Sequence, residues 1–219
     1  MKNIWIIANW KSNKTIEEAL SWISVVGPKI EKRENLKVVV CPPFSALSEV
    51  KKAITIGNFP LLVGSQDLSP YEVGAYTGEE SAALMNELIS LSILGHSERR
   101  KNFDETDEMV AKKVKQALDN RITPLVCVQS KDTPVPDGAK LIAYEPVFAI
   151  GTGNPDTPEN SNEVAGSFKE NGVEVLYGGS VDSKNVKGFL IQENINGVLV
   201  GGASLDPEEF VKIVQNAIR

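Results

Sequence analysis

Short apolar runs and amphipathic segments alternate along the whole chain. The apolar runs hold few polar side chains, which is typical of strands buried on both faces of a parallel sheet. Most of the segments between them place apolar residues on one face of a helix. The runs predict strands at residues 4–9, 37–41, 61–65, 91–94, 123–128, 141–145, 174–177 and 197–200, and the segments predict helices at 16–26, 45–54, 81–88, 106–118, 158–171, 186–192 and 207–218.

Eight predicted strands that alternate with helices favour a parallel sheet closed into a (β/α)8 barrel. Thr157-Pro158 and Asp206-Pro207 each place an N-cap residue before a proline at the first helical position. A doubly wound open sheet is the alternative, but no Gly-x-Gly-x-x-Gly motif follows the first run. We expect a single α/β domain over residues 1–219.

The connection between residues 128 and 141 departs from this alternation. Pro134, Pro136 and Gly138 exclude a regular helix, so we expect a bare crossover with no helix after the fifth strand. Val135 is the only sizeable apolar side chain in this connection. We therefore expect the outer flank of strands five and six to be poorly covered, which suggests burial by a neighbouring subunit.

Composition narrows the classes of function. The net charge of −6 argues against a surface that tracks nucleic-acid phosphates, so any anion site must be local. No apolar run approaches the roughly 20 residues needed to span a bilayer, and no signal peptide is expected. Cys41 and Cys127 end different apolar runs and predict buried thiols in a reducing cytoplasm. Their spacing suggests no zinc or iron–sulfur site, and the single histidine excludes a His-rich metal site.

A parallel barrel carries its active site at the carboxyl ends of its strands, so polar residues and glycines just after each run are the candidates. Glycine pairs after strands seven and eight fall where barrels commonly bind phosphate, although such pairs are also ordinary turns. Lysines are mostly solvated, and a lone histidine is more often structural than catalytic. The candidates are Asn9, Lys11, His96, Glu145, Gly178, Gly179, Ser180, Gly201 and Gly202.

The run from Ala143 to Gly153 is the most informative of these. Its apolar start ends at Glu145, and Pro146 stops the strand because proline has no N–H to donate. A short apolar loop closed by Gly151 follows, which could fold over the carboxylate and exclude water. Alone, the run would equally fit an edge carboxylate before an ordinary turn. With a neutral imidazole, a lysine and a phosphate cradle, it indicates proton transfer next to a carbonyl on a small phosphorylated substrate.

Several longer motifs resemble those of the triosephosphate isomerases, and the similarity covers nearly the whole chain. The resemblance implies a TIM barrel that interconverts dihydroxyacetone phosphate and D-glyceraldehyde 3-phosphate through an enediolate, in glycolysis and gluconeogenesis, with no cofactor and no metal. A neutral catalytic histidine is an established feature of this family. The motifs are Asn9-Trp10-Lys11 and those at residues 74–79, 95–100, 143–153 and 177–181.

The resemblance also implies residue roles. Glu145 would move the proton, His96 would polarise the carbonyl, Lys11 would offset negative charge beside Asn9, and Glu98 would support the site. Ser97 is where the base of the family rests when its lid is open. The lid would comprise Pro146, Val147, Phe148, Ala149, Ile150, Gly151 and Thr152, and backbone N–H groups of Gly151, Ser180, Gly201 and Gly202 would hold the phosphate.

Two departures from the family pattern fall on the lid. Phe148 stands where most members have a tryptophan, and Ser130 stands where the glutamate that meets this tryptophan would lie. Loss of one partner would leave a polar group without a hydrogen bond, whereas loss of both can leave stability nearly unchanged. We therefore interpret the two departures as a coupled replacement. A different phosphate-binding barrel enzyme and a non-catalytic relative with a defective lid remain as alternatives.

The long loop at residues 66–79 is typical of a functional segment. In the family, Thr77 near its tip inserts into the neighbouring subunit, and Tyr76 lies beside it in the sequence. We expect a homodimer, and the flank of strands five and six suggests a tetramer as the bolder hypothesis.

Overall fold

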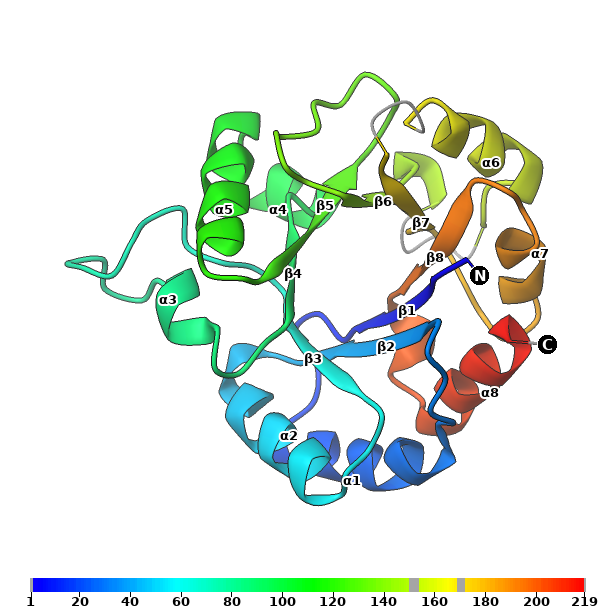
Figure 1. Cartoon of the computed structure of the whole chain (residues 1–219), viewed down its shortest axis with the longest axis horizontal. Helices are drawn as coiled ribbons and strands as arrows, with labels where there is room; N and C mark the ends of the chain where they lie inside the picture. The colour runs from blue at the N-terminus through cyan, green and yellow to red at the C-terminus, as the bar shows by residue number, and fades with distance from the viewer. Residues whose placement is uncertain (1, 150–153, 169–171, 219) are drawn as a thin grey trace.

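The structure, a computed structural model, describes residues 2–149, 154–168 and 172–218. Eight parallel strands pair in sequence order, and the last pairs with the first to close a barrel with helices outside it (Figure 1). The predicted barrel is confirmed, and the open sheet is excluded. The strands are β1 Ile4–Asn9, β2 Leu36–Cys41, β3 Leu62–Ser65, β4 Leu91–Leu94, β5 Thr123–Val128, β6 Leu141–Tyr144, β7 Glu174–Tyr177 and β8 Ile195–Val200.

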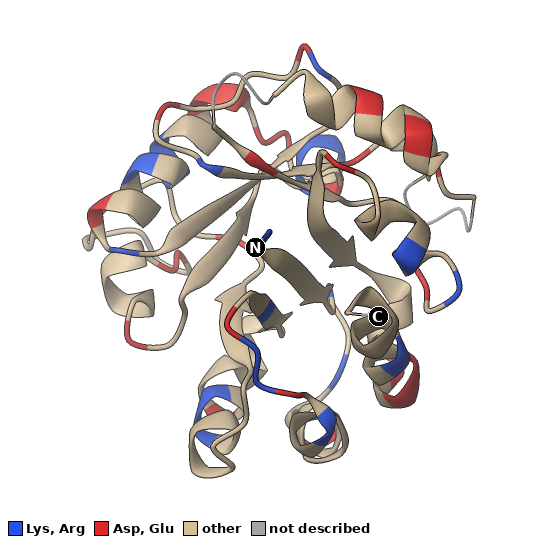
Figure 2. Cartoon of the chain, turned by 45° about the vertical axis from the view of Figure 1, so that its right-hand side comes forward, with Lys and Arg blue, Asp and Glu red and all other residues tan. Residues whose placement is uncertain are grey.

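The apolar runs are continuous because each strand is buried on both faces. Side chains that alternate along a strand point to opposite sides of the sheet. Ile7 and Leu125 belong to the cluster inside the barrel, whereas Ile6 and Val126 belong to the larger layer between the sheet and the helices. Charged residues lie mainly on the outer helices and loops (Figure 2).

The helices follow the predicted order with local differences at their ends. The predicted N-caps at Thr157 and Asp206 are confirmed, since each side chain accepts a backbone N–H three residues on. The helices are α1 Ile16–Val26, α2 Phe44–Ile56, α3 Ala82–Met85, α4 Ser97–Asn102, α5 Asp107–Asp119, α6 Pro158–Gly166, α7 Val186–Leu190 and α8 Pro207–Ala217, with 3-10 turns η1 Gly27–Lys29, η2 Val147–Ala149 and η4 Gly202–Ser204.

Two predicted helices are too long by more than a few residues. The helix expected at residues 81–88 is the single turn α3, after which the chain continues as turns to β4. The helix expected at 158–171 ends at Gly166, and its predicted residues 169–171 lie outside the described residues. Glycine favours a helix end because it has the largest backbone entropy to lose in a helix.

The bare crossover after β5 is confirmed, but the expectation of a poorly covered flank is wrong. The described residues 129–140 contain no helix. Val126 and Ile142 nevertheless have no exposed surface, and Ala139 and Val135 of the crossover pack in the same apolar layer. Gly138 lies so close to α5 that a Cβ atom there would meet Leu118 Cδ1 at 2.7 Å. The crossover folds back over its own strands, so this flank gives no reason for a neighbouring subunit.

Among the described residues, no helix is both long enough and apolar enough to cross a membrane.

Candidate active site

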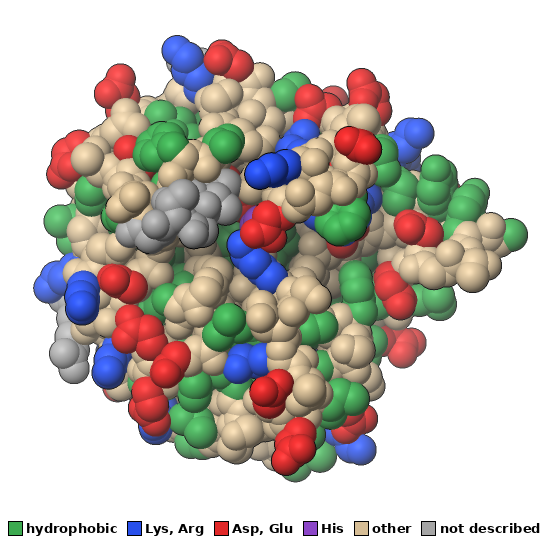
Figure 3. All heavy atoms as spheres, turned by 180° about the vertical axis from the view of Figure 1, so that it is seen from behind, with side chains coloured by type: hydrophobic (Ala, Val, Ile, Leu, Met, Phe, Trp, Pro, Cys, Tyr) green, Lys and Arg blue, Asp and Glu red, His purple; other side chains and the backbone are tan. Residues whose placement is uncertain are grey.

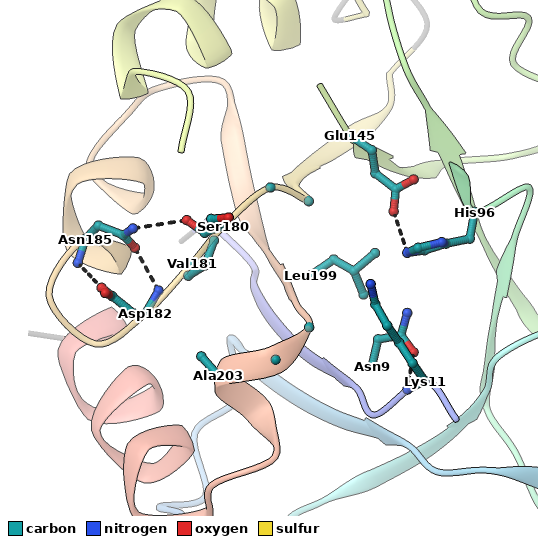
Figure 4. Close-up of a pocket in the computed structure, with 14 residues that line it drawn as sticks. Asn9, Lys11, His96, Glu145, Ser180, Val181, Asp182, Asn185, Leu199 and Ala203 are labelled. Carbon is teal, nitrogen blue, oxygen red and sulfur yellow. Dashed lines mark hydrogen bonds and ion pairs between the residues drawn. The ribbon is translucent and has the colours of Figure 1, made fainter. Parts of the chain in front are cut away.

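A cavity of about 330 Å³ opens at the carboxyl ends of the strands, where the sequence predicted the site. It brings together side chains from opposite sides of the barrel, with the base and the imidazole at one end and the loop after β7 at the other (Figure 4). Its lining consists of Asn9, Lys11, His96, Glu145, Gly178, Gly179, Ser180, Val181, Asp182, Asn185, Leu199, Gly201, Gly202 and Ala203.

Glu145 stands one residue beyond β6, where its backbone N–H donates to Val128 at 2.8 Å. The residue has no exposed surface, so it is not the edge carboxylate of the alternative interpretation. Its Oε2 accepts the backbone N–H of Ser97 at 2.9 Å. Its Oε1 lies 3.0 Å from Nε2 of His96 but accepts no hydrogen bond from the residues that the structure describes. One oxygen therefore anchors the carboxylate, and the other is left to accept a proton.

His96 directly precedes the short helix α4, and the fold fixes its tautomer. The backbone N–H of Glu98 donates to Nδ1 of His96 at 3.1 Å. Because Nδ1 accepts this bond, a neutral ring carries its proton on Nε2. The imidazole is 6 % exposed, and Nε2 faces the cavity beside Glu145. A neutral His96 therefore places a largely buried N–H donor at the wall of the cavity, beside Glu145.

Lys11 follows β1 in the left-handed backbone region, with φ of 53°. Such a conformation costs about 1–3 kcal/mol for a residue other than glycine, so the surroundings must hold it. Its backbone N–H donates to Asn9 Oδ1 at 3.0 Å, and its carbonyl accepts from Gln66 Nε2 at 2.9 Å. Its ammonium group pairs with Glu98, which does not line the cavity itself. These contacts hold a cation at the cavity.

The glycine pair after β8 opens the 3-10 turn η4. The first hydrogen bonds in this turn run from Ser204 N–H to the carbonyl of Gly201, so the N–H groups before Ser204 have no acceptor within the turn. The Trp22 indole donates to the Ser204 carbonyl at 2.9 Å and holds the turn in place. A Cβ atom on Gly201 would lie 3.5 Å from Lys11 Cε, so backbone donors and the cation lie together. This end suits a phosphate group.

The glycine pair after β7 makes room for side chains, which the sequence could not show. A Cβ atom on Gly178 would meet Glu145 Cγ at 2.9 Å, and one on Gly179 would meet the Tyr177 hydroxyl oxygen at 2.2 Å. The next residue, Ser180, donates its hydroxyl to the Ala149 carbonyl at 2.8 Å. The pair therefore allows close packing around the base, and the adjoining Ser180 ties the loop after β7 to η2.

The predicted lid is described only in its first part. Pro146 precedes η2, in which Val147 and Phe148 are 67 % and 61 % exposed and Ala149 is buried. Ile150, Gly151 and Thr152, predicted as lid residues, with Gly151 also predicted to bind phosphate, lie outside the described residues.

Sequence reasoning missed the residues that hold the site in shape. Gln66 directly follows β3 and donates to the carbonyls of Lys11 and Cys41, so the strand-end rule could have found it. Trp22 lies on the buried face of α1 and looks in sequence like any core residue. Asn185 binds the loop after β7, and its distance from the strand end hid it. Across the described residues, no group of three His, Cys, Asp or Glu side chains could hold a metal ion.

The fold and the cavity define an enzyme class, the phosphate-binding (β/α)8 barrels that move protons on small substrates. Within that class, the chain belongs to the triosephosphate isomerase family. The family model described as triosephosphate isomerase matches residues 4–141 and 135–217. These two matches meet in the crossover after β5, where the chain has no helix.

Curated relatives match over nearly their full length. The triosephosphate isomerase of Dehalococcoides mccartyi (strain CBDB1) is 37 % identical over 248 positions, covering 99 % of this chain and 97 % of the relative. That of Caldanaerobacter subterraneus subsp. tengcongensis is 39 % identical over 249 positions, covering 98 % and 99 %. That of Aquifex aeolicus is 38 % identical over 242 positions, covering 95 % and 97 %. The alignments exceed the 219 residues of this chain, so the relatives contain segments that it lacks.

Proposed function

We propose that Glu145, His96 and Lys11 are the catalytic residues for the reaction of this family. The reaction interconverts dihydroxyacetone phosphate and D-glyceraldehyde 3-phosphate through an enediolate, a step of glycolysis and gluconeogenesis. The observation that carries the assignment is the pair formed by Glu145 and His96. A buried carboxylate oxygen without a hydrogen bond from the described residues lies 3.0 Å from the one imidazole, at the wall of the cavity.

The proton transfers follow from this arrangement. The Glu145 carboxylate removes a proton from the carbon next to the substrate carbonyl, and the electron pair of that C–H bond moves towards the carbonyl oxygen. The Nε2–H of His96 donates to that oxygen and stabilises its developing charge. The protonated Glu145 then returns a proton to the neighbouring carbon, while His96 moves a proton between the two oxygens. All atoms of the substrate stay in the product, so these steps balance with the side chains named and need no oxidant, reductant or group donor.

Lys11 and the backbone donors account for the anionic end of the substrate. The Lys11 ammonium group offsets the charges of the enediolate and the phosphate, and the Asn9 amide beside it serves as a donor. Backbone N–H groups of Ser180, Gly201 and Gly202 hold the phosphate, and each of these residues lines the cavity. Gly151 would add a further donor when the lid, residues 146–152, covers the substrate and excludes water.

Glu98 and Ser97 act as supports. The Glu98 carboxylate pairs with the Lys11 ammonium group, and its backbone N–H fixes the tautomer of His96. The Ser97 backbone N–H anchors one oxygen of Glu145. In the proposal, Phe148 and Ser130 affect how the lid closes and have no role in the proton transfers.

Turnover of D-glyceraldehyde 3-phosphate tests this assignment. We expect the unmodified chain to form dihydroxyacetone phosphate and Glu145→Gln, which keeps the shape of the side chain, to lose about 10²–10⁴-fold or more in kcat. A folded unmodified chain without turnover would contradict the assignment and favour a relative whose lid no longer works. Binding of inorganic phosphate would then show whether the anion site is intact.

The loop at residues 66–79 supports a homodimer. Residues 71–80 are all exposed, and the loop projects from the barrel with apolar side chains on it (Figure 3). The rings of Tyr71 and Tyr76 stack with centroids 4.3 Å apart, so the tip presents a flat aromatic surface. At its base, Asp67 pairs with the buried Lys113 at 2.7 Å. A firmly anchored, apolar projection fits insertion into a second copy, with Thr77 near the tip. The tetramer expected from the flank of strands five and six loses its support, because the crossover covers that flank.

A single-domain chain acting in the cytoplasm completes the proposal. One apolar layer between the sheet and the helices includes residues from β1 to α8, as expected of one domain over residues 1–219. Cys41 and Cys127 are free and buried, which fits a reducing compartment.

A further inference from the structure

The side chain of Asn185 binds the loop after β7 at two backbone groups. The Asn185 amide nitrogen donates to the Ser180 carbonyl at 3.1 Å, and its amide oxygen accepts the Asp182 N–H at 3.0 Å. The Asn185 backbone N–H in turn donates to the Asp182 carboxylate at 3.0 Å. Figure 4 shows this network beside the cavity, which all three residues line.

These bonds fix the direction of the peptide group that joins Ser180 to Val181. A trans peptide group is planar, so its C=O and its N–H point in opposite directions. Because the Ser180 carbonyl is turned to Asn185, the Val181 N–H faces away from Asn185. In Figure 4, Asn185 lies on the far side of Ser180 from Lys11 and Glu145, so the Val181 N–H faces the part of the cavity that holds these two residues.

We propose that Asn185 is a positioning residue that keeps this loop selective for a phosphate monoester dianion. The inference rests on the proposed function, which places the phosphate at Ser180, Gly201 and Gly202. With the Asn185 amide present, the Ser180 carbonyl is withdrawn from the cavity. Without the amide, that carbonyl can rotate towards the dianion, and its oxygen then repels the phosphate oxygens.

The same loop provides a matched control. The Asn216 amide nitrogen, on α8, donates to the Ser183 carbonyl at 2.8 Å, and Asn216 does not line the cavity. Asn185→Ala and Asn216→Ala therefore each remove a hydrogen bond from a side-chain amide to a backbone carbonyl of the same loop. Only the hydrogen bond of Asn185 orients a peptide group at the cavity. We expect Asn185→Ala to raise both the KM and the inhibition constant of inorganic phosphate about tenfold, the effect of one hydrogen bond. We expect kcat to change less and Asn216→Ala to leave all three constants within about twofold.

An inhibition constant that is unchanged in Asn185→Ala would overturn the inference. An inhibition constant raised equally in Asn216→Ala would also overturn it, because the effect would then come from a general loosening of the loop. Thermal unfolding of each variant checks that it is folded, and Asn185→Ser replaces Asn185→Ala if the latter is not.

Calorimetric titration with inorganic phosphate separates this inference from the proposed function, because it needs no turnover. If the unmodified chain does not isomerise the triose phosphate, the proposed function fails, and the phosphate affinities of the variants still decide the role of Asn185. Absence of phosphate binding by the unmodified chain would overturn the inference as well.

Discussion

The α-carbon of Gly178 lies against the side chain of Glu145, so closely that a Cβ atom on Gly178 would be 2.9 Å from Glu145 Cγ. Real Cβ contacts are essentially never shorter than 3.0 Å, so any larger residue at position 178 must move the carboxylate or the strand beneath it. The glycine that follows β7 therefore determines where Glu145, just after β6, can lie.

Gly178→Ala tests this relationship. We expect a loss of about 10²-fold in kcat, because displacement of a catalytic group by about 1 Å has an effect of that size. Gly188→Ala is the matched control, since a Cβ atom there makes only an ordinary contact at 3.5 Å with Pro158. Steady-state kinetics of both variants, with unfolding curves to compare their stability, measure the effect. Equal activities in the two variants would contradict the account.

The tautomer of His96 can be observed directly, because the chain has a single histidine. The Glu98 N–H that donates to Nδ1 requires the proton of the neutral ring to be on Nε2. We expect the ¹⁵N NMR shifts of the labelled imidazole to show a protonated Nε2 and an unprotonated Nδ1. A ring with its proton on Nδ1 could not donate from Nε2, and that result would remove His96 from the role of electrophile.

The two thiols predict how stability depends on pH. Burial raises the pKa of the Cys41 thiol well above its usual range, and burial together with the neighbouring Glu145 carboxylate raises the pKa of Cys127. In the unfolded chain both thiols ionise at about pH 8.5. Their contribution to stability is therefore complete below about pH 8.5 and is lost as the pH rises from there towards the raised pKa values of the folded state.

We expect the free energy of unfolding, from urea titrations, to fall between about pH 8 and pH 10. Cys41→Ala with Cys127→Ala should flatten this decline at the cost of overall stability, because each substitution leaves a small cavity. We also expect neither thiol of the folded chain to react readily with a thiol reagent near pH 8. Rapid modification of the folded chain would contradict the assigned burial.

If the projecting loop forms the dimer interface, a single charge placed on it should disrupt the dimer. Tyr76 is 45 % exposed and stacks on Tyr71. Tyr76→Asp places a charge in the proposed interface, so we expect light scattering to show a monomer and kinetics to show reduced activity. Ile191→Asp is the control, because Ile191 is 72 % exposed and lies outside the loop. An unmodified chain that is monomeric at micromolar concentration would contradict the proposed dimer.

The sequence predicted the strands well, and it selected side chains that line one cavity, because both leave local signals. Continuous apolar runs identify strands buried on both faces. The rule that active sites lie at the carboxyl ends of barrel strands selected His96 and Glu145 without knowledge of the side-chain positions. Contacts between distant segments leave no such signal. The return of Val135 over its own strands and the space that Gly178 leaves for the base depend on the closed fold. Gln66 was within reach of the strand-end rule, whereas Asn185 lies several residues past its strand.

Solvent exchange during turnover tests the central claim, that Glu145 carries the proton between the two carbons. D-glyceraldehyde 3-phosphate is converted in D₂O, and the product is analysed by NMR for deuterium bound to carbon. The account predicts that the unmodified chain yields dihydroxyacetone phosphate containing deuterium, because the protonated carboxyl group exchanges with solvent before it returns a proton. It also predicts that Glu145→Gln loses isomerisation and deuterium incorporation together. A Glu145→Gln variant that isomerises and incorporates deuterium at the rate of the unmodified chain would contradict the account.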